Sequence, residues 1–125
     1  MDFEIKTIPH NEQRYETVGD WKRDKNGVMQ IRVSDMGNPD YEFLVALHEL
    51  IESYYCIKNG ITEDVVDKWD FNHPDSNDPG MLLHCPYQPY HFKATLFEER
   101  ACLELGCDWS EYDKSINKLF REDIK

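Results

Sequence analysis

Apolar and polar residues alternate along the first 36 positions with the two-residue period of a half-buried β-strand. The alternation is clearest in residues 28–34, and we also expect short strands at residues 3–8 and 15–21. The Asn26-Gly27 pair accepts positive φ angles at low cost, which favours a hairpin turn just before residue 28. This part of the chain therefore predicts a small antiparallel sheet of two or three strands.

From Asn38 onward the apolar residues recur with helical spacing, and start and stop residues divide the chain into about four helices. Asn38 and Pro39 are typical of a helix start, and Asn59-Gly60 is typical of a helix end. The expected helices, in chain order, cover residues 39–58, 62–71, 89 or 90 to 105, and 108 or 110 onward. A long loop rich in turn-forming residues separates the second helix from the third. The fold class is therefore α+β, with residues 1–125 as a single domain.

The helix expected at residues 39–58 carries polar side chains on its apolar side. At 100° per residue, His48 and Glu52 lie about 40° apart, one turn from each other, among apolar and aromatic residues. Glu49 lies about 100° from His48, at the edge of this face. An ionised carboxylate on a buried face is costly unless it is paired, and a metal ion is one candidate partner.

The helix expected at residues 89–105 shows the same feature. His91 and Glu98 lie within about 20° of each other on its small, apolar side. If the two buried faces meet, His48, Glu52 and His91 supply three ligands for one divalent ion, with zinc as the first candidate. An ion held in this way activates water, and Glu49 is placed to accept the proton of that water as general base.

The third ligand has alternatives. His91 and Glu98 are seven residues apart, about 10 Å along a helix, so they are not expected to bind one ion together. If His91 is the ligand, Glu98 is expected to support the site from behind the ligands. If Glu98 is the ligand, His91 lies at the mouth of the cleft, and His84 is a third possibility because its loop could fold over the site. Tyr87 or Tyr90 could donate a hydrogen bond to a developing oxyanion.

The run His48-Glu49-Leu50-Ile51-Glu52 resembles the His-Glu-x-x-His helix of the zincin metalloproteases, with Glu52 in place of the second histidine. The resemblance implies a minimal zincin-like fold, a zinc ion bound by His48 and Glu52, Glu49 as the base, and peptide hydrolysis. In the zincins whose third ligand is a glutamate on a later helix, Glu98 is the matching position. The whole chain is also similar to small uncharacterised phage and bacterial proteins that carry this run.

The charge of the chain excludes some function classes. The 125 residues include 14 Lys and Arg and 25 Asp and Glu, which gives a net charge of −11. We therefore expect no direct nucleic-acid binding and no docking on anionic lipid. No membrane-spanning or signal segment is expected, since acidic Asp2 and Glu4 stand at the start, and a cytoplasmic location is the prediction.

Two function classes follow from these features. The first is a metal-dependent hydrolase that acts on a peptide or another small molecule, with peptidase activity as the first candidate. The alternative is a non-catalytic acidic interaction module, which could mimic nucleic acid to occupy a basic site on a partner. In that alternative the buried polar residues form a structural metal site or a hydrogen-bond network.

Overall fold

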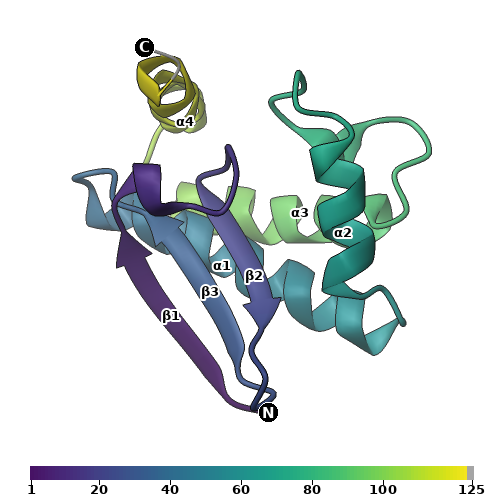
Figure 1. The fold of residues 1–125 in the computed structure, drawn as a ribbon. Coiled ribbons are helices and arrows are strands. Elements are labelled where there is room, and N and C mark those ends of the chain that lie inside the picture. Colours follow the sequence, from purple (N-terminus) through teal and green to yellow (C-terminus); the bar gives the residue numbers. More distant parts are fainter. Residues whose placement is uncertain (124–125) are drawn as a thin grey trace.

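In the part of the chain that the structure describes, three strands and four α-helices make up the α+β fold that the sequence predicts (Figure 1). The computed structural model describes the backbone of residues 1–123 and the side chains of residues 1–120. The strands are β1 (Phe3–Ile8), β2 (Gly19–Arg23) and β3 (Met29–Ser34), and they lie side by side in the order β1-β3-β2. The helices are α1 (Pro39–Lys58), α2 (Glu63–Phe71), α3 (Gln88–Leu105) and α4 (Trp109–Asp123).

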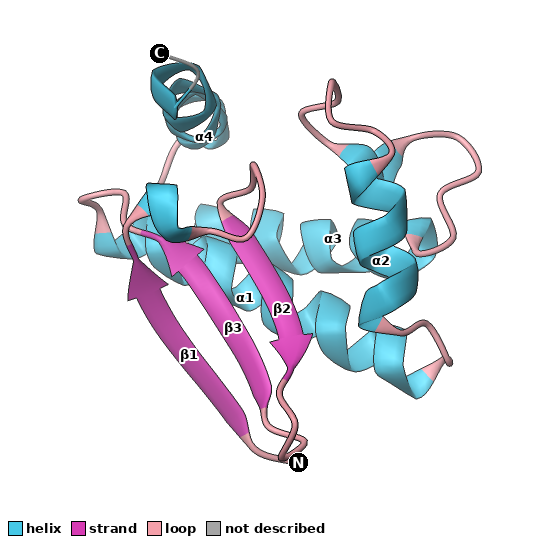
Figure 2. Ribbon diagram, in the orientation of Figure 1, coloured by secondary structure: helices cyan, strands magenta, loops and turns pink. Residues whose placement is uncertain are grey.

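The sheet is mixed, whereas an entirely antiparallel sheet was expected. β2 and β3 form the predicted antiparallel hairpin, but β1 pairs with β3 in parallel, as the arrow directions in Figure 2 show. After β1 the chain passes through a short 3-10 helix at His10–Glu12 and continues to the far edge of the sheet before β2 begins. β3 then returns between the two outer strands, which run in opposite directions. Its pairing with β1 is therefore parallel.

Helix α1 has the predicted bounds, and its ends show the expected chemistry. The Asn38 side-chain oxygen accepts hydrogen bonds from the backbone amides of Asp40 and Tyr41, at 3.0 and 3.2 Å. At the end of α3, Gly106 adopts a φ of 75°, a left-handed conformation that glycine reaches without strain. Local sequence signals thus mark the start of α1 and the end of α3.

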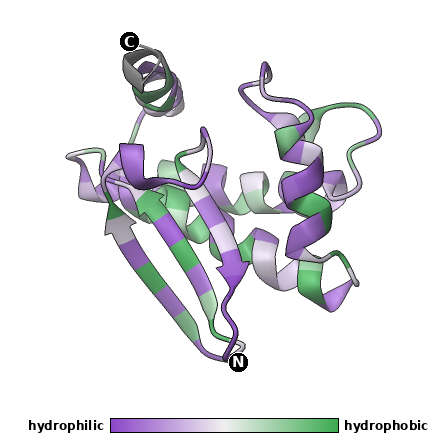
Figure 3. Cartoon of the chain, in the orientation of Figure 1, coloured by the Kyte–Doolittle hydropathy of each residue, from purple (hydrophilic) through white to green (hydrophobic). Residues whose placement is uncertain are grey.

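Helix α1 lies between the sheet and α3, with β2 and β3 on one side and α3 on the other (Figure 1). Met29, Ile31 and Val33 of β3 form the sheet side of the core, in one cluster with Leu44 and Val45 of α1. The alternation of hydrophobic and hydrophilic residues along β3 and β1 is visible in Figure 3. Both neighbours of α1 cover it, so any polar side chain on its buried faces needs a partner.

Candidate metal centre

Helix α1 places two polar side chains on its buried surface, as its sequence predicts. His48 and Glu52 are 9 % and 5 % exposed, and His48 Nε2 lies 3.1 Å from Glu52 Oε2. Residues four apart stand one above the other on a helix, so this pair is a direct result of helical geometry. Two potential metal ligands are therefore in place before any other element contributes.

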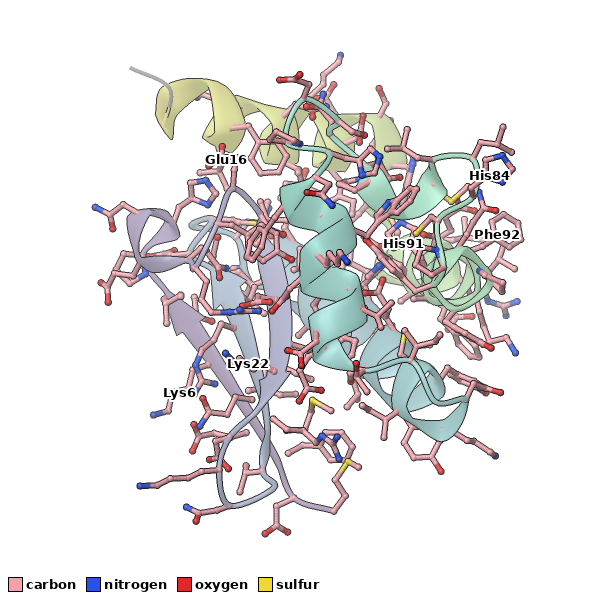
Figure 4. The ribbon with its side chains drawn as sticks, turned by 45° about the vertical axis from the view of Figure 1, so that its right-hand side comes forward. Lys6, Glu16, Lys22, His84, His91 and Phe92 are labelled. Carbon is pink, nitrogen blue, oxygen red and sulfur yellow. The ribbon has the colours of Figure 1, made fainter. Side chains whose placement is uncertain are left out.

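Helix α3 supplies the third group. His91 Nδ1 lies 2.7 Å from Glu52 Oε2 and 3.1 Å from His48 Nε2. In Figure 4, His91 points from α3 into the interior of the molecule. His48, Glu52 and His91 thus form a buried group that could hold a metal ion, as the sequence predicts. The faces of α1 and α3 that carry polar residues do meet.

The outer nitrogen of each imidazole is held by a carboxylate. His48 Nδ1 lies 2.7 Å from Glu98 Oε1, and His91 Nε2 lies 2.7 Å from Asp78 Oδ1. An ionised carboxylate can only accept a hydrogen bond, so each of these outer nitrogens carries the proton. In the neutral tautomers, the inner nitrogens then direct their lone pairs toward Glu52 Oε2. Bonding of the outer nitrogen to a carboxylate is the usual arrangement for histidines that bind metals.

A buried tryptophan holds the carboxylate of Glu52. The indole Nε1 of Trp21, on β2, donates to Glu52 Oε1 at 3.0 Å in a buried hydrogen bond. Glu52 Oε2 is the carboxylate oxygen that faces the two histidines. One carboxylate oxygen of Glu52 therefore faces the two histidines, while the other accepts a hydrogen bond from β2 of the sheet.

Without a metal ion, these groups carry opposed charges at close range. Burial alone would lower the pKa of both histidines, but the hydrogen bonds of His48 to Glu52 and Glu98 raise its pKa well above the usual value. The contacts of His91 with Asp78 and Glu52 raise its pKa to about 9. Burial would raise the pKa of Glu52, but its hydrogen bonds from the two histidines hold that pKa well below the usual value.

Protonation of both histidines creates a conflict between them. Each inner nitrogen would then carry a hydrogen, and the two nitrogens lie only 3.1 Å apart. One divalent cation can replace both protons, turn the three lone pairs into ligands and remove this repulsion. The ligand atoms lie 2.7 to 3.1 Å apart. This is slightly less than the roughly 3.3 Å between ideal tetrahedral ligands of zinc, so small side-chain shifts would open the cluster around an ion.

Glu49 lies beside this cluster. Its Oε2 is 3.9 Å from His48 Nε2, and the residue is 9 % exposed. Among the described residues, no hydrogen bond uses its carboxylate. Burial raises the pKa of Glu49 well above its usual value, and the nearby charge of Glu52 adds to the rise. A carboxyl group of this kind can take up and release a proton next to the ligands.

Two glycines give the site its space. A Cβ at Gly19 would lie 2.7 Å from Val45 Cγ1 and 2.8 Å from Glu49 Cγ. A Cβ at Gly80 would lie 2.5 to 2.7 Å from the His91 ring. Only glycine allows these two segments to pack so closely against Glu49 and His91. A glycine in a turn-rich loop was the only sequence signal for Gly80, and nothing in the sequence indicated Gly19.

The structure also places the other predicted site residues. Glu98 contacts the outer nitrogen of His48, which is the supporting position expected for it when His91 is the ligand. His84 is exposed and lies on the outer side of its loop, away from His91 (Figure 4). Tyr90 is partly buried against the core, whereas Tyr87 lines the cavity beside the site and donates its hydroxyl to Asp70.

Helix α4 connects to the site through one residue that the sequence did not single out. The Tyr112 hydroxyl donates to Glu98 Oε2, while Glu98 Oε1 accepts from His48. Tyr112 is 1 % exposed. A chain of hydrogen bonds thus runs from α4 through Glu98 to His48 and holds the imidazole in position.

The cluster opens into a cavity of about 380 Å³. His48, Glu52 and His91 line it, as does Glu49, and one face of α4 forms part of its wall. This volume is sufficient for a small ligand or a peptide side chain with its flanking backbone. The possible metal ligands and the possible base are therefore all accessible to a ligand in the cavity.

No family model, curated protein or solved structure matches this chain. Among the described residues, no helix is long and apolar enough to cross a membrane.

Proposed function

We propose that this protein is a metal-dependent hydrolase that binds one divalent ion, with zinc as the first candidate, through His48, Glu52 and His91. The observation that carries the proposal is the convergence of their three lone pairs, with both outer imidazole nitrogens held by carboxylates. Glu49 beside the cluster and the adjoining cavity favour catalysis over a purely structural site.

A divalent ion at this position would supply a Lewis acid that polarises a carbonyl and lowers the pKa of water. Glu49 would accept one proton from the attacking water as the oxygen of that water bonds to the carbonyl carbon. Glu49 would then deliver this proton to the leaving nitrogen as the carbon–nitrogen bond breaks. Trp21 and Glu98 would keep Glu52 and His48 in place throughout.

Peptide or amide hydrolysis is the reaction we propose first, because the run from His48 to Glu52 resembles the zincin helix. The alternative is an acidic interaction module, for which four ligands closing off a structural ion would be expected. Three ligands facing a cavity support the catalytic proposal instead.

Metal binding is tested by elemental analysis of the purified protein after reconstitution with zinc, manganese or nickel. We expect one ion per chain, and we expect His48→Ala and Glu52→Ala to lose it while their far-ultraviolet circular dichroism stays unchanged. His84→Asn is the matched control, because His84 is exposed and has a φ of 69°, which asparagine tolerates. Absence of a bound ion from the reconstituted parent protein would rule out the site.

Catalysis is tested separately with Glu49→Gln. This variant should keep the ion and lose at least about a hundredfold in peptide or amide hydrolysis, as expected when a general base is removed. Glu104→Gln, which changes an exposed glutamate on α3, should leave hydrolysis unchanged. If Glu49→Gln hydrolyses the substrate as fast as the parent, Glu49 is not the base.

A further inference from the structure

The lining of the cavity beside the cluster differs in chemistry from one part to another. The three candidate ligands and Glu49 form one part of it, and a face of helix α4, called the α4 wall below, forms another. The α4 face contributes Trp109, Ile116 and Phe120, with Tyr112 at the point where the helix reaches Glu98. A ligand that reaches the cluster therefore lies along an apolar and aromatic surface.

The charge of the cavity lining is strongly one-sided. Seven of the described lining residues are Asp or Glu, and none is Lys or Arg. Six of these acids have partners in the protein. Glu52, Glu98 and Asp78 contact the histidines, Asp20 contacts Arg14, and Asp70 accepts from two tyrosines. Asp113 is exposed on α4 and accepts from Asn117 at 3.4 Å, while Glu49 stands beside His48.

This lining disfavours anionic ligands. Proteins that recognise phosphate or a terminal carboxylate use Arg, Lys or a helix N-terminus at the binding position. Here a negatively charged group would meet carboxylates on several sides, and one divalent ion would offset only part of that charge. A positive group, in contrast, would find Asp113 near the α4 wall.

We propose that the substrate is a neutral or basic peptide-like amide with a large apolar side chain and no acidic group next to the bond that is cut. This inference rests on the proposed hydrolase function and names its substrate class. The apolar side chain lies against Ile116 and Phe120, while the carbonyl reaches the cluster of His48, Glu52 and His91. A basic residue beside it faces Asp113. Enzymes that release a carboxyl-terminal residue by gripping its carboxylate belong to a different class.

Binding can be measured without turnover in the zinc-loaded Glu49→Gln protein. The probes are two blocked hexapeptides with a central leucine, one with lysine and the other with glutamate on both sides, titrated by calorimetry. We expect the lysine peptide to bind at least about tenfold more tightly. Equal binding, tighter binding of the glutamate peptide, or binding of neither peptide would overturn the proposal.

Two variants in the same background locate the effect. Asp113→Lys should reduce the difference between the peptides to about threefold or less. Ile116→Ala should weaken binding of the lysine peptide about tenfold, whereas Leu119→Ala, a change on α4 outside the cavity lining, should not. If Leu119→Ala weakens binding as much as Ile116→Ala, the α4 wall is not the binding surface.

Two different results would distinguish a wrong substrate class from a wrong hydrolase function. If peptides with acidic flanks are cut by the parent protein in a reaction that depends on Glu49, the hydrolase proposal stands and the substrate class is wrong. If the parent protein binds no ion, the hydrolase proposal itself fails, whatever the peptide titrations show.

Discussion

The two halves of the candidate metal centre are built in different ways. Helix α1 provides His48 and Glu52 from one rigid element, four residues apart. The other half is His91 on α3, whose outer nitrogen is held by Asp78 and whose ring packs against Gly80, both from the loop before the helix. The first half depends on helical periodicity, whereas the second depends on the folding of a loop.

The two carboxylates that contact the outer imidazole nitrogens also differ in their exposure to solvent. The Glu98 side chain, which holds His48, is 10 % exposed, whereas the Asp78 side chain, which holds His91, is 57 % exposed. Buried charged contacts act in a lower dielectric than exposed ones. Substitutions in the α1 half should therefore cause large losses of zinc affinity, and substitutions in the His91 half should cause smaller losses.

The largest expected effect is that of Glu52→Ala. This change removes the one oxygen that both histidines contact, and zinc affinity should fall at least about a thousandfold. His91→Ala should retain weak binding, because the His48 and Glu52 pair on α1 stays intact. Competition titrations with a zinc chelator measure both variants, with circular dichroism to confirm folding. A weaker effect for Glu52→Ala than for His91→Ala would contradict the central place given to α1.

Acidity should affect both halves, because each contributes one histidine with a raised pKa. A raised pKa in the folded state stabilises the metal-free protein below the unfolded value of about 6.5. This contribution is lost as the pH rises through the folded value, which is about 9 for His91. The melting temperature of the protein in chelator should therefore fall by several degrees between these two pH values.

The affinity for zinc should increase with pH, because zinc competes with the protons of the same two histidines. Its affinity should increase by about tenfold or more per pH unit between about pH 6.5 and pH 8. The measurement is a chelator competition at several pH values beside the thermal scans. A pH-independent affinity would mean that the two imidazoles are already unprotonated at their inner nitrogens.

Substitutions at the two close-packed glycines test metal binding and hydrolysis separately. Gly80→Ala pushes a Cβ against the His91 ring and should weaken zinc binding about tenfold to a hundredfold. Gly19→Ala instead crowds Val45 and Glu49, so zinc affinity should change by about threefold or less while hydrolysis falls about tenfold or more. Each variant is the control for the other, and equal zinc loss in both would show general loosening of the fold.

Sequence patterns predicted the α1 half because its determinants are local. The Asn38 cap, the bounds of Pro39–Lys58 and the spacing of His48 and Glu52 all follow from helix geometry. His91 was predicted as the third ligand by the same reasoning on α3, together with the assumption that two buried polar faces meet. Glu98 was predicted as its alternative or its support, and in the structure Glu98 contacts the outer nitrogen of His48.

Contacts that come from loops or distant elements could not be read from the sequence. Asp78 was one acid among many in a turn-rich loop, and nothing in the sequence set Tyr112 apart from the other aromatic residues. The parallel pairing of β1 was missed for the same reason, since it depends on the path of the chain between Ile8 and Gly19. Such features depend on three-dimensional proximity, for which hydrophobic periodicity holds no signal.

The two carboxylates that contact the outer imidazole nitrogens test the difference between the halves most finely, because the comparison ends on the small effect expected for Asp78. Glu98→Gln removes a buried charge from His48 and should weaken zinc binding about tenfold to a hundredfold. Asp78→Asn removes an exposed charge from His91, so solvent screening should limit its effect to about threefold. Both changes keep a hydrogen-bond acceptor for the imidazole, so the comparison isolates charge from geometry. Equal losses would mean that the Asp78 loop closes over His91 in solution and shields that contact as fully as α4 shields Glu98.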